Sequence, residues 1–549
     1  WPSWPSFPMC YFAAPEFAAF KARATKDPDT LSFHEAMNSP HRAEWMKAAQ
    51  EEISALEAKG TWTEVSMSDA KTKILPGTWV FRIKRSPAGE IKKFKGRYCV
   101  RGDLEENKDE LDTYSPVAAW SSVRLFLTLC LLMGWTTVSI DFSNAFVQSK
   151  LHYPVWIHIP RGFVSCKGPG TCLRLNMSLY GLAISPSLWA KTCIAGFKKL
   201  GFVQSQFDEC LLYRDGMIVV LYVDDAGIGA KDPADIDRLI DDLRGLGFEL
   251  KKEGSFSEFL GIKFDYRPDG SIELTQKGLI KKILQTTKME NCKPNLLPVS
   301  APLASDPDGP PMNEDWHYSS VIGMLLYLST NTRCDIAFAV SQVARFSANP
   351  KQSHATAVKS IIRYLKRTEN QGTIIRPTGK LDLDLYVDAD FCGLFRTAPD
   401  HSVDSARSRT GFVIMLNGCP LIWKSQLQSS VTCSTLEAEY NALSYALRIL
   451  LPLKRTLVEA VERMNLPPDF RTSIRARAFE DNQGAYLLAI THRITNRTRY
   501  FLNKFHWFWE HGAEFEIFKI DSRNQRADYF TKPLSRELFE NNRFLVQGW

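Results

Sequence analysis

The first residues that could do chemistry are three aspartates at the ends of two predicted strands. Between residues 137 and 142 apolar and polar residues alternate, so a strand places Asp141 opposite its apolar face, towards solvent or a cleft. An apolar strand from Met217 ends in the adjacent carboxylates of Asp224 and Asp225. Such a pair is repulsive unless a cation lies between its members, and hard cations prefer oxygen ligands. The spacing favours a divalent-metal site, with a solvated hairpin turn as the alternative.

Further carboxylates form a second candidate site in the last third of the chain. Strict alternation from Leu381 places Asp388 near the end of a strand. The pattern Ser434–Glu437 is typical of a helix capping box, which gives Glu437 a structural role. Glu439 borders the apolar stripe of the same helix and is therefore the better functional candidate. Glu480, Asp481 and Asp528 are further acids, each beside a predicted helix start. Carboxylates on one strand and on neighbouring helix ends thus form the second candidate site.

Several elements must position these two sets. An amphipathic helix is predicted over 41–58, and a basic β-hairpin over 79–101. The apolar stretch 125–135 is too short to span a bilayer and suits a buried helix. Prolines cluster over 294–311, which favours an extended linker, and two helical patterns follow over 318–366. From residue 381 onwards, a strand-rich segment leads into alternating helices and strands.

Composition limits the class of protein. A length of 549 residues with 44% apolar composition allows several cores and predicts three to four modules. The formal net charge of +7 permits a polyanionic partner without requiring one. The twelve cysteines form no C-x-x-C pair and no zinc-finger spacing, so neither a disulfide framework nor a structural zinc is expected.

The motifs around the first aspartates occur in a family-specific order. Tyr222–Asp225 resembles the signature of reverse transcriptases, and Asp141–Phe146 resembles the motif that supplies their first catalytic aspartate. Further matching motifs are Trp79–Lys84, Tyr114–Val117, Leu179–Leu182 and Phe259–Ile262. Their order is typical of copia-type (Pseudoviridae) LTR-retrotransposon polymerases, and the resemblance runs from about residue 40 to the C-terminus. The order of the carboxylates in the second site resembles that of the copia-type ribonuclease H. By position, this resemblance assigns the second set as Asp388, Glu439, Asp481 and Asp528. It leaves Asp390, Glu437 and Glu480 to capping or solvation.

This resemblance implies a multidomain α+β and α/β fold, a right-hand polymerase with fingers, palm and thumb, a connection region and a C-terminal RNase H-like domain. The expected modules are a flexible N-terminal extension (1–38), fingers and palm (39–272), thumb start and Pro-rich linker (273–310), thumb and connection helices (311–380), RNase H domain (381–535) and C-terminal tail (536–549).

The implied activity is RNA-directed DNA polymerisation with ribonuclease H cleavage of the RNA strand of the hybrid. Each active site would use two Mg²⁺ ions, with Mn²⁺ as an alternative. The implied partners are an RNA template, a DNA primer, the RNA–DNA hybrid and dNTPs, with integrase and capsid of the same element as further candidates. No membrane partner is expected. The implied location is cytoplasmic virus-like particles, or the nucleus together with the element DNA. The alternative is a catalytically inactive nucleic-acid-binding remnant of such a polyprotein.

The resemblance also assigns individual residues. The metal ligands and catalytic carboxylates are Asp141, Asp224, Asp225, Asp388, Glu439, Asp481 and Asp528. The nucleotide-binding residues are Lys95, Arg97, Phe146, Tyr180 and Gly181. Phe146 would block a ribose 2′-hydroxyl, although a core phenylalanine is the alternative. For Lys95 and Arg97 the alternative is a solvated hairpin. Residues 183–184 read Ala-Ile where the commoner family pattern has Lys-Gln, which removes two polar groups beside this pocket.

Basic residues after the polymerase motifs complete the assignment. A helix over 274–289 resembles the thumb helix and carries Lys277, Lys281 and Lys282 as nucleic-acid contacts. Arg497 and Arg499 resemble substrate contacts of the ribonuclease H, although Tyr500 replaces a family histidine there. A solvated surface is the alternative for both groups.

Overall fold

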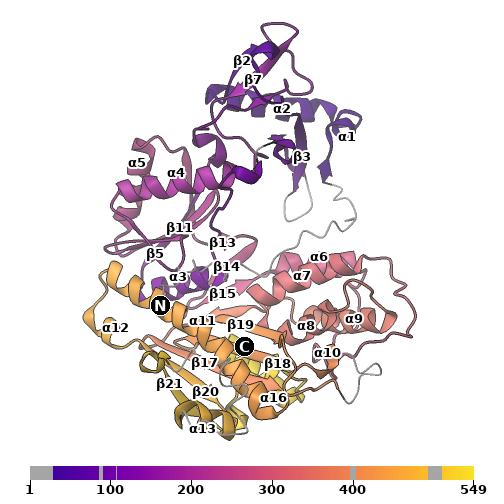
Figure 1. The fold of residues 1–549 in the computed structure, drawn as a ribbon, viewed down its shortest axis with the longest axis vertical. Coiled ribbons are helices and arrows are strands. Elements are labelled where there is room, and N and C mark those ends of the chain that lie inside the picture. Colours follow the sequence, from indigo (N-terminus) through magenta and orange to yellow (C-terminus); the bar gives the residue numbers. More distant parts are fainter. Residues whose placement is uncertain (1–28, 86–90, 107, 396–402, 492–509) are drawn as a thin grey trace.

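The computed structural model describes residues 29–85, 91–106, 108–395, 403–491 and 510–549. The N-terminal sheets lie at the top of Figure 1 and the C-terminal sheet at the bottom. Arg497 and Arg499 lie outside the described residues, as do residues 86–90 within the predicted basic hairpin.

Two three-stranded sheets and two helices form the N-terminal part. One sheet has the order β1-β3-β4, and the other has the order β2-β7-β6. The predicted amphipathic helix and basic hairpin are both confirmed, as α2 and the β3–β4 pair. The elements are β1 (Thr30–Leu31), α1 (Phe33–Met37), α2 (Arg42–Ala58), β2 (Trp62–Ser66), β3 (Gly77–Arg85), β4 (Ile91–Val100), β6 (Trp156–Ile157) and β7 (Thr171–Leu175).

The prediction of a flexible extension up to residue 38 is wrong for residues 30–37. Thr30 pairs with Arg82 of β3, and Ser32 caps α1 with a complete capping box. Because β1 completes a sheet and Ala36 of α1 is buried in the N-terminal core, this segment belongs to the folded part.

A six-stranded sheet lies at the centre of the chain, in the order β12-β5-β11-β10-β9-β8. The apolar stretch around Leu125 forms the buried helix α3, as predicted. Helices α4 and α5 cover one face of the sheet, where they share a core with β5, β10 and β11 (Figure 1). The elements are α3 (Trp120–Met133), β5 (Thr136–Phe142), α4 (Ser185–Lys199), β8 (Val203–Gln204), β9 (Leu211–Arg214), β10 (Met217–Tyr222), β11 (Asp225–Ala230), α5 (Pro233–Gly245) and β12 (Leu250–Ser255).

A four-stranded sheet and four helices follow, with the strand order β13-β14-β15-β16. The expected helix over 274–289 begins later, at Lys277, because residues 272–275 are a strand of this sheet. The segment 318–366 holds three helices rather than the two predicted. The elements are β13 (Glu258–Phe259), β14 (Ile262–Tyr266), β15 (Ile272–Thr275), α6 (Lys277–Thr286), α7 (Tyr318–Asn331), α8 (Ala337–Ala344), α9 (Gln352–Arg367) and β16 (Thr373–Ile375).

The proline-rich segment 294–311 is extended, as predicted, but it is not a free-standing linker. The amide of Asn295 donates to the carbonyl of Arg363 on α9, and the amide of Leu303 donates to Gln342 on α8. The prolines deny backbone donors, so the chain packs against these helices instead of forming a strand.

The C-terminal part contains a five-stranded sheet in the order β19-β18-β17-β20-β21. Strands β17, β20 and β21 are parallel, and β17–β18–β19 are antiparallel, which matches the predicted change from strands to alternating helices and strands. The residues 536–549 expected as a tail form helix α16, whose Phe539 and Val546 are buried. The elements are β17 (Asp382–Asp390), α10 (Val403–Ala406), β18 (Arg409–Leu416), β19 (Cys419–Leu427), α11 (Thr435–Arg463), α12 (Pro468–Thr472), β20 (Arg475–Glu480), α13 (Gln483–Thr491), β21 (Glu516–Lys519), the 3-10 turn η9 (Asp528–Phe530) and α16 (Arg536–Gln547).

Hydrogen bonds in two regions join the C-terminal part to the central sheet and its helix α3. Arg124 of α3 donates to the carbonyl of Leu421 on β19 at 2.7 Å. At its far end, α11 reaches the edge of the central sheet, where Ser205 donates to Glu459 at 2.6 Å and the amide of Gly216 donates to Met464. Helix α11 therefore runs from one sheet to the other (Figure 1).

The eleven cysteines within the described ranges are free thiols, in agreement with the absence of a disulfide pattern in the sequence. Over the same ranges, no helix is long and apolar enough to cross a membrane.

Candidate carboxylate sites

The first aspartates meet at the end of the β10–β11 hairpin. Antiparallel pairing of β11 with β5 places Asp225 directly opposite Asp141, and Asp224 lies in the turn between β10 and β11. The amide of Phe142 donates to the carbonyl of Asp224 at 2.7 Å, which ties the turn to β5. Strand register therefore brings the three aspartates together where the inner strands β5, β10 and β11 meet at one end of the central sheet.

The turn itself is strained. Val223 has a φ of +52°, a left-handed conformation that is a genuine outlier for a β-branched residue. The indole of Trp189, fully buried on α4, donates to the carbonyl of Val223 and holds it there. Strain of this kind persists only where the surroundings impose it, and it concentrates at functional sites.

Repulsion between the first aspartates is evident at Asp225. Burial, followed by the charges of Asp224 and Asp141, raises the pKa of Asp225 to about 7. An adjacent cation would reverse this shift because it favours the ionised form. The arrangement can thus bind a cation. It is looser than the second site, however, since these three aspartates are not among the described carboxylates whose oxygens converge within 4.8 Å.

Predicted nucleotide-binding residues gather next to these aspartates. The guanidinium of Arg97 lies 5.4 Å from the ring centre of Tyr180, and the ring of Phe146 lies 5.0 Å from that of Tyr180. Burial raises the pKa of Tyr180 to about 12, with further effects from Arg97, Asp224 and Asp141. The structure therefore brings the exposed guanidinium of Arg97 and the rings of Phe146 and Tyr180 close to the aspartates.

Gly181 allows the strand β4 to approach this cluster closely. Its φ is +95°, and a Cβ atom there would lie 2.0 Å from the carbonyl oxygen of Val100. The amide of Val100 in turn donates to the carbonyl of Tyr180 at 2.7 Å. Lys95, half-buried on β4, shares one face of the strand with Arg97 because they are two residues apart.

The predicted hairpin Phe259–Ile262 is confirmed as the β13–β14 pair, with Leu260 and Gly261 both at positive φ. Phe259 contacts the ring of Tyr222, so this hairpin adjoins the strand that leads to the aspartates. Of the predicted nucleic-acid contacts on α6, Lys281 and Lys282 are exposed, whereas Lys277 is half-buried and lies 3.9 Å from Asp265. Their role as phosphate contacts stays a prediction.

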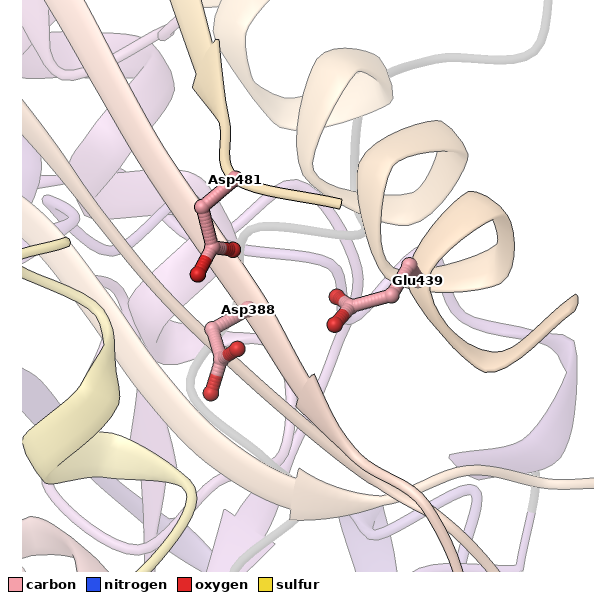
Figure 2. A group of neighbouring side chains, drawn as sticks. All are labelled: Asp388, Glu439 and Asp481. Atoms are coloured by element: carbon pink, nitrogen blue, oxygen red, sulfur yellow. The ribbon is translucent and has the colours of Figure 1, made fainter. Parts of the chain in front are cut away.

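Three carboxylates of the second set converge in the C-terminal sheet (Figure 2). Asp388 lies on β17, Glu439 on the first turns of α11, and Asp481 directly after β20. One oxygen from each lies within 4.8 Å of the others, and within the described part of the chain this is the one such group of three. Strand alternation had singled out Asp388 and the helical stripe Glu439, whereas Asp481 came from the family resemblance; the catalytic role of all three stays a prediction.

The burial of these groups favours a cation between them. Asp388 and Glu439 are buried, and burial raises the pKa of each. The buried Oε2 of Glu439 has no hydrogen-bond partner, and such an orphaned oxygen is costly. Asp481 is held in place by Ser522, which donates to its Oδ2 at 2.6 Å. This all-oxygen set with a free buried ligand atom fits a hard divalent cation.

Asp528 is linked to Asp388 by a shared lysine. It does not belong to the converging group of three, but the ammonium of Lys532 contacts both Asp528 and Asp388. Burial and the Asp388 charge raise the pKa of Asp528 to about 7. Thr531 donates a hydrogen bond to Oδ2 of Asp388. The sequence analysis missed Thr531 and Lys532. They follow Asp528 by three and four residues, a spacing that places side chains on the same side of a helical turn, and this was the available signal.

One of the acids assigned to capping or solvation differs from expectation. Glu480 is fully buried rather than solvated, with its Oε1 accepting from the amide of Asn482 and its Oε2 without a partner. Glu480 follows the buried Ala476 and Ala478 at two-residue spacing, so strand alternation indicates its burial. Glu437 has the expected capping role: its amide donates to Ser434, and its carboxylate accepts from the amide of Cys433.

Comparisons with known proteins agree with this picture. A family model described as "Reverse transcriptase (RNA-dependent DNA polymerase)" matches residues 59–301. The chain is 29% identical over 537 residues to the "Retrovirus-related Pol polyprotein from transposon TNT 1-94" of Nicotiana tabacum, covering 95% of this chain and 39% of the relative. It is 30% identical over 509 residues to the corresponding polyprotein from transposon RE1 of Arabidopsis thaliana, covering 90% and 33%.

A shorter relative is the "Putative transposon Ty5-1 protein" of Saccharomyces cerevisiae, which is 29% identical. The match covers 56% of this chain and 98% of that relative. A solved foamy viral protease-reverse transcriptase in complex with double-stranded DNA has a TM-score of 0.47 and 12% identity, covering 87% of this chain and 70% of that chain. Residues 59–301 thus match the reverse-transcriptase family, and over most of its length the chain is similar to copia-type retrotransposon Pol polyproteins. It spans between a third and two fifths of the TNT 1-94 and RE1 polyproteins.

Proposed function

We propose that this protein is an RNA-directed DNA polymerase that also cleaves the RNA strand of the resulting hybrid. The observation that carries the proposal is the register that sets Asp225 opposite Asp141, with Asp224 at the hairpin tip. The match to the reverse-transcriptase family model supports it, because the matched residues 59–301 include all three aspartates.

The sheets correspond to the parts of a right-hand polymerase. We assign the N-terminal sheets with α2 to the fingers and the six-stranded sheet to the palm. The four-stranded sheet and α6 to α9 are assigned to the thumb and connection, and the five-stranded sheet to an RNase H-like domain. The fingers then begin at residue 30 instead of residue 39, because β1 pairs with β3.

The residues around the first aspartates would divide the work of nucleotide transfer. Divalent cations bound to Asp141 and Asp224, with Asp225 in support, would stabilise the attacking and leaving oxygens of the reaction. Lys95 and Arg97 would hold the triphosphate by charge. Phe146, packed against Tyr180, would exclude a ribose 2′-hydroxyl.

The second set would serve hydrolysis of the RNA strand. Asp388, Glu439 and Asp481 would hold one cation, and Asp388 with Asp528 would hold another. The unpartnered buried oxygen of Glu439 supports this role, since a ligand would satisfy it. The partners that follow from this function are an RNA template, a DNA primer, their hybrid and dNTPs.

Primer extension on an RNA template tests the polymerase. Wild type and Asp224→Asn are compared in Mg²⁺, with Asp242→Asn on the exposed side of α5 as a matched control that loses the same charge. We expect extension by wild type and control and a loss of at least a hundredfold in Asp224→Asn, because a charged ligand is replaced by a neutral one. If wild type binds the template–primer but extends no better than the mutant, the protein is a silent nucleic-acid-binding remnant.

Cleavage of a hybrid labelled in its RNA strand tests the nuclease. Asp388→Asn should lose cleavage yet keep primer extension, and Asp224→Asn should do the reverse, so each variant controls for the folding of the other. Equal cleavage by wild type and Asp388→Asn would remove the nuclease from the proposal and leave the polymerase standing.

A further inference from the structure

Lys532 occupies a position that the predicted roles leave unexplained. Its Nζ lies 2.9 Å from Oδ1 of Asp528 and 3.8 Å from Oδ2 of Asp388. Asp388 also belongs to the converging group with Glu439 and Asp481. The ammonium therefore bridges Asp528 and a carboxylate that also belongs to the converging group.

Local structure fixes this position. Asp528 begins the 3-10 turn η9, and Lys532 follows it by four residues, so its side chain returns over the turn. Thr531 donates to the same Oδ2 of Asp388 that Lys532 contacts. The turn can come this close because residue 411 of β18, paired with Asp388, is a glycine; a Cβ there would lie 2.5 Å from the methyl group of Thr531.

Charge explains why a cation is needed here. Asp388 and Asp528 repel each other, and burial raises the pKa of both. They in turn raise the pKa of Lys532, so that the ammonium stays protonated at neutral pH. The Lys532 side chain is 42% exposed, which lets it swing into solvent without unpacking the core.

We propose that the Lys532 ammonium holds the place of the second divalent cation between Asp388 and Asp528, and that a cation entering there must displace it. This inference rests on the proposed nuclease function. Within the described residues no ion pair reaches the carboxylates of Glu439 or Asp481, although Lys519 donates to the backbone carbonyl of Asp481. The site that these two carboxylates form with Asp388 would therefore fill first. Lys532 would thus make the second cation bind more weakly and later than the first.

Direct measurement of Mn²⁺ binding tests this proposal without relying on activity. All proteins carry Asp224→Asn to weaken the polymerase site, and bound Mn²⁺ is measured by electron paramagnetic resonance and calorimetry. In the parent we expect one tighter and one weaker class of site at the nuclease centre. Lys532→Gln should tighten the weaker class by about tenfold, since a competing charge next to a carboxylate has effects of this order. Lys532→Arg keeps the charge and should leave that class weak.

Lys288→Gln is the matched control, because it removes one positive charge from a surface ion pair with Asp315 in another part of the molecule. It should leave both classes unchanged. A second measurement, the Mg²⁺ concentration for half-maximal hybrid cleavage without the Asp224 substitution, should fall about tenfold in Lys532→Gln. Lys532→Met, which keeps the aliphatic stem, replaces the glutamine variant in both experiments if that variant unfolds.

The outcomes separate the two proposals. Unchanged or weaker binding of the second Mn²⁺ in Lys532→Gln or Lys532→Met would overturn the role of Lys532. If Asp388→Asn binds as much Mn²⁺ as its parent, the nuclease centre itself is wrong, whatever Lys532 does.

Discussion

Asp225 is a carboxyl group that keeps its proton near neutral pH in the metal-free protein, since burial and two neighbouring aspartates raise its pKa to about 7. The unfolded chain would release that proton near pH 4. The folded state therefore binds the proton more tightly, and its stability falls as the pH rises from about 4 to about 7.

Asp225→Asn removes this cost because an amide is always neutral. We expect its Tm in EDTA to exceed that of wild type by on the order of 2 °C at pH 8, and to equal it at pH 4. Differential scanning calorimetry at the two pH values measures this, with Asp242→Asn as control. A gain of the same size at both pH values would mean that relief of charge is not its cause.

Phe146 is only partly buried and rests on Tyr180, so it is available to contact a sugar. Phe146→Ala should raise the kcat/KM for ribonucleotides relative to deoxynucleotides by about tenfold or more, since steric exclusion of the hydroxyl is lost. Single-nucleotide incorporation with both substrates gives the ratio. An unchanged ratio would favour the alternative reading of Phe146 as a core residue.

At the level of residues, local patterns identified the side chains whose orientation is set by a single strand or helix. Asp141 and Glu439 follow directly from a strand and a helix pattern. Glu480 was misassigned because a carboxylate in a strand is ordinarily solvated, although its place after Ala476 and Ala478 on the inward side indicates burial.

At the scale of elements, the position of η9 depends on Gly411 of β18. A Cβ at Gly411 would meet Thr531 at 2.5 Å and Phe530 at 2.8 Å. Gly411→Ala should push η9 away from β18, lower the free energy of unfolding by about 1–3 kcal/mol and weaken Mn²⁺ binding at Asp388. Urea denaturation and the Mn²⁺ titration measure the two effects.

Gly323→Ala is the control for this change, because Gly323 lies inside α7 with no atom within 4 Å of an added Cβ. It should raise stability by about 0.5–1 kcal/mol through helix propensity. If Gly411→Ala behaves in the same way, η9 is not held by the close approach inferred here.

Elements built from local patterns were predictable, including α2, the basic hairpin and the hairpin that carries Asp224. The bridge that Lys532 forms between Asp528 and Asp388 was not, because about 140 residues separate the two aspartates and a short 3-10 turn leaves no periodic pattern. The start of α6 was misplaced for a related reason: the strand before it is defined by its pairing with β14 and β16, which no local pattern reveals.

In the whole molecule, Arg124 connects three parts of the chain. From α3 it donates to Leu421 on β19 and to Thr330 and Asn331 at the end of α7, and it lies 4.0 Å from the ring centre of Trp423. Arg124→Ala would leave these carbonyls without donors, and we expect a loss of about 2–4 kcal/mol of stability.

Chemical denaturation measures the loss, and limited proteolysis should show earlier cleavage between the central and C-terminal sheets. Arg244→Ala, which breaks an exposed ion pair with Asp241, should change stability by less than about 0.5 kcal/mol. Equal effects of the two substitutions would argue against a connecting role for Arg124.

Helix α11 carries Glu439 near its start and Glu459 near its end, twenty residues or about 30 Å further on, where Ser205 of the central sheet binds it. Beside that end, β10 begins after Gly216 and runs to Tyr222, next to the first aspartates. A helix and a strand in series thus form a molecular ruler between the two carboxylate centres. A duplex engaged by both would be cut at a constant offset behind the growing primer end, set by this ruler and not by the sequence being copied.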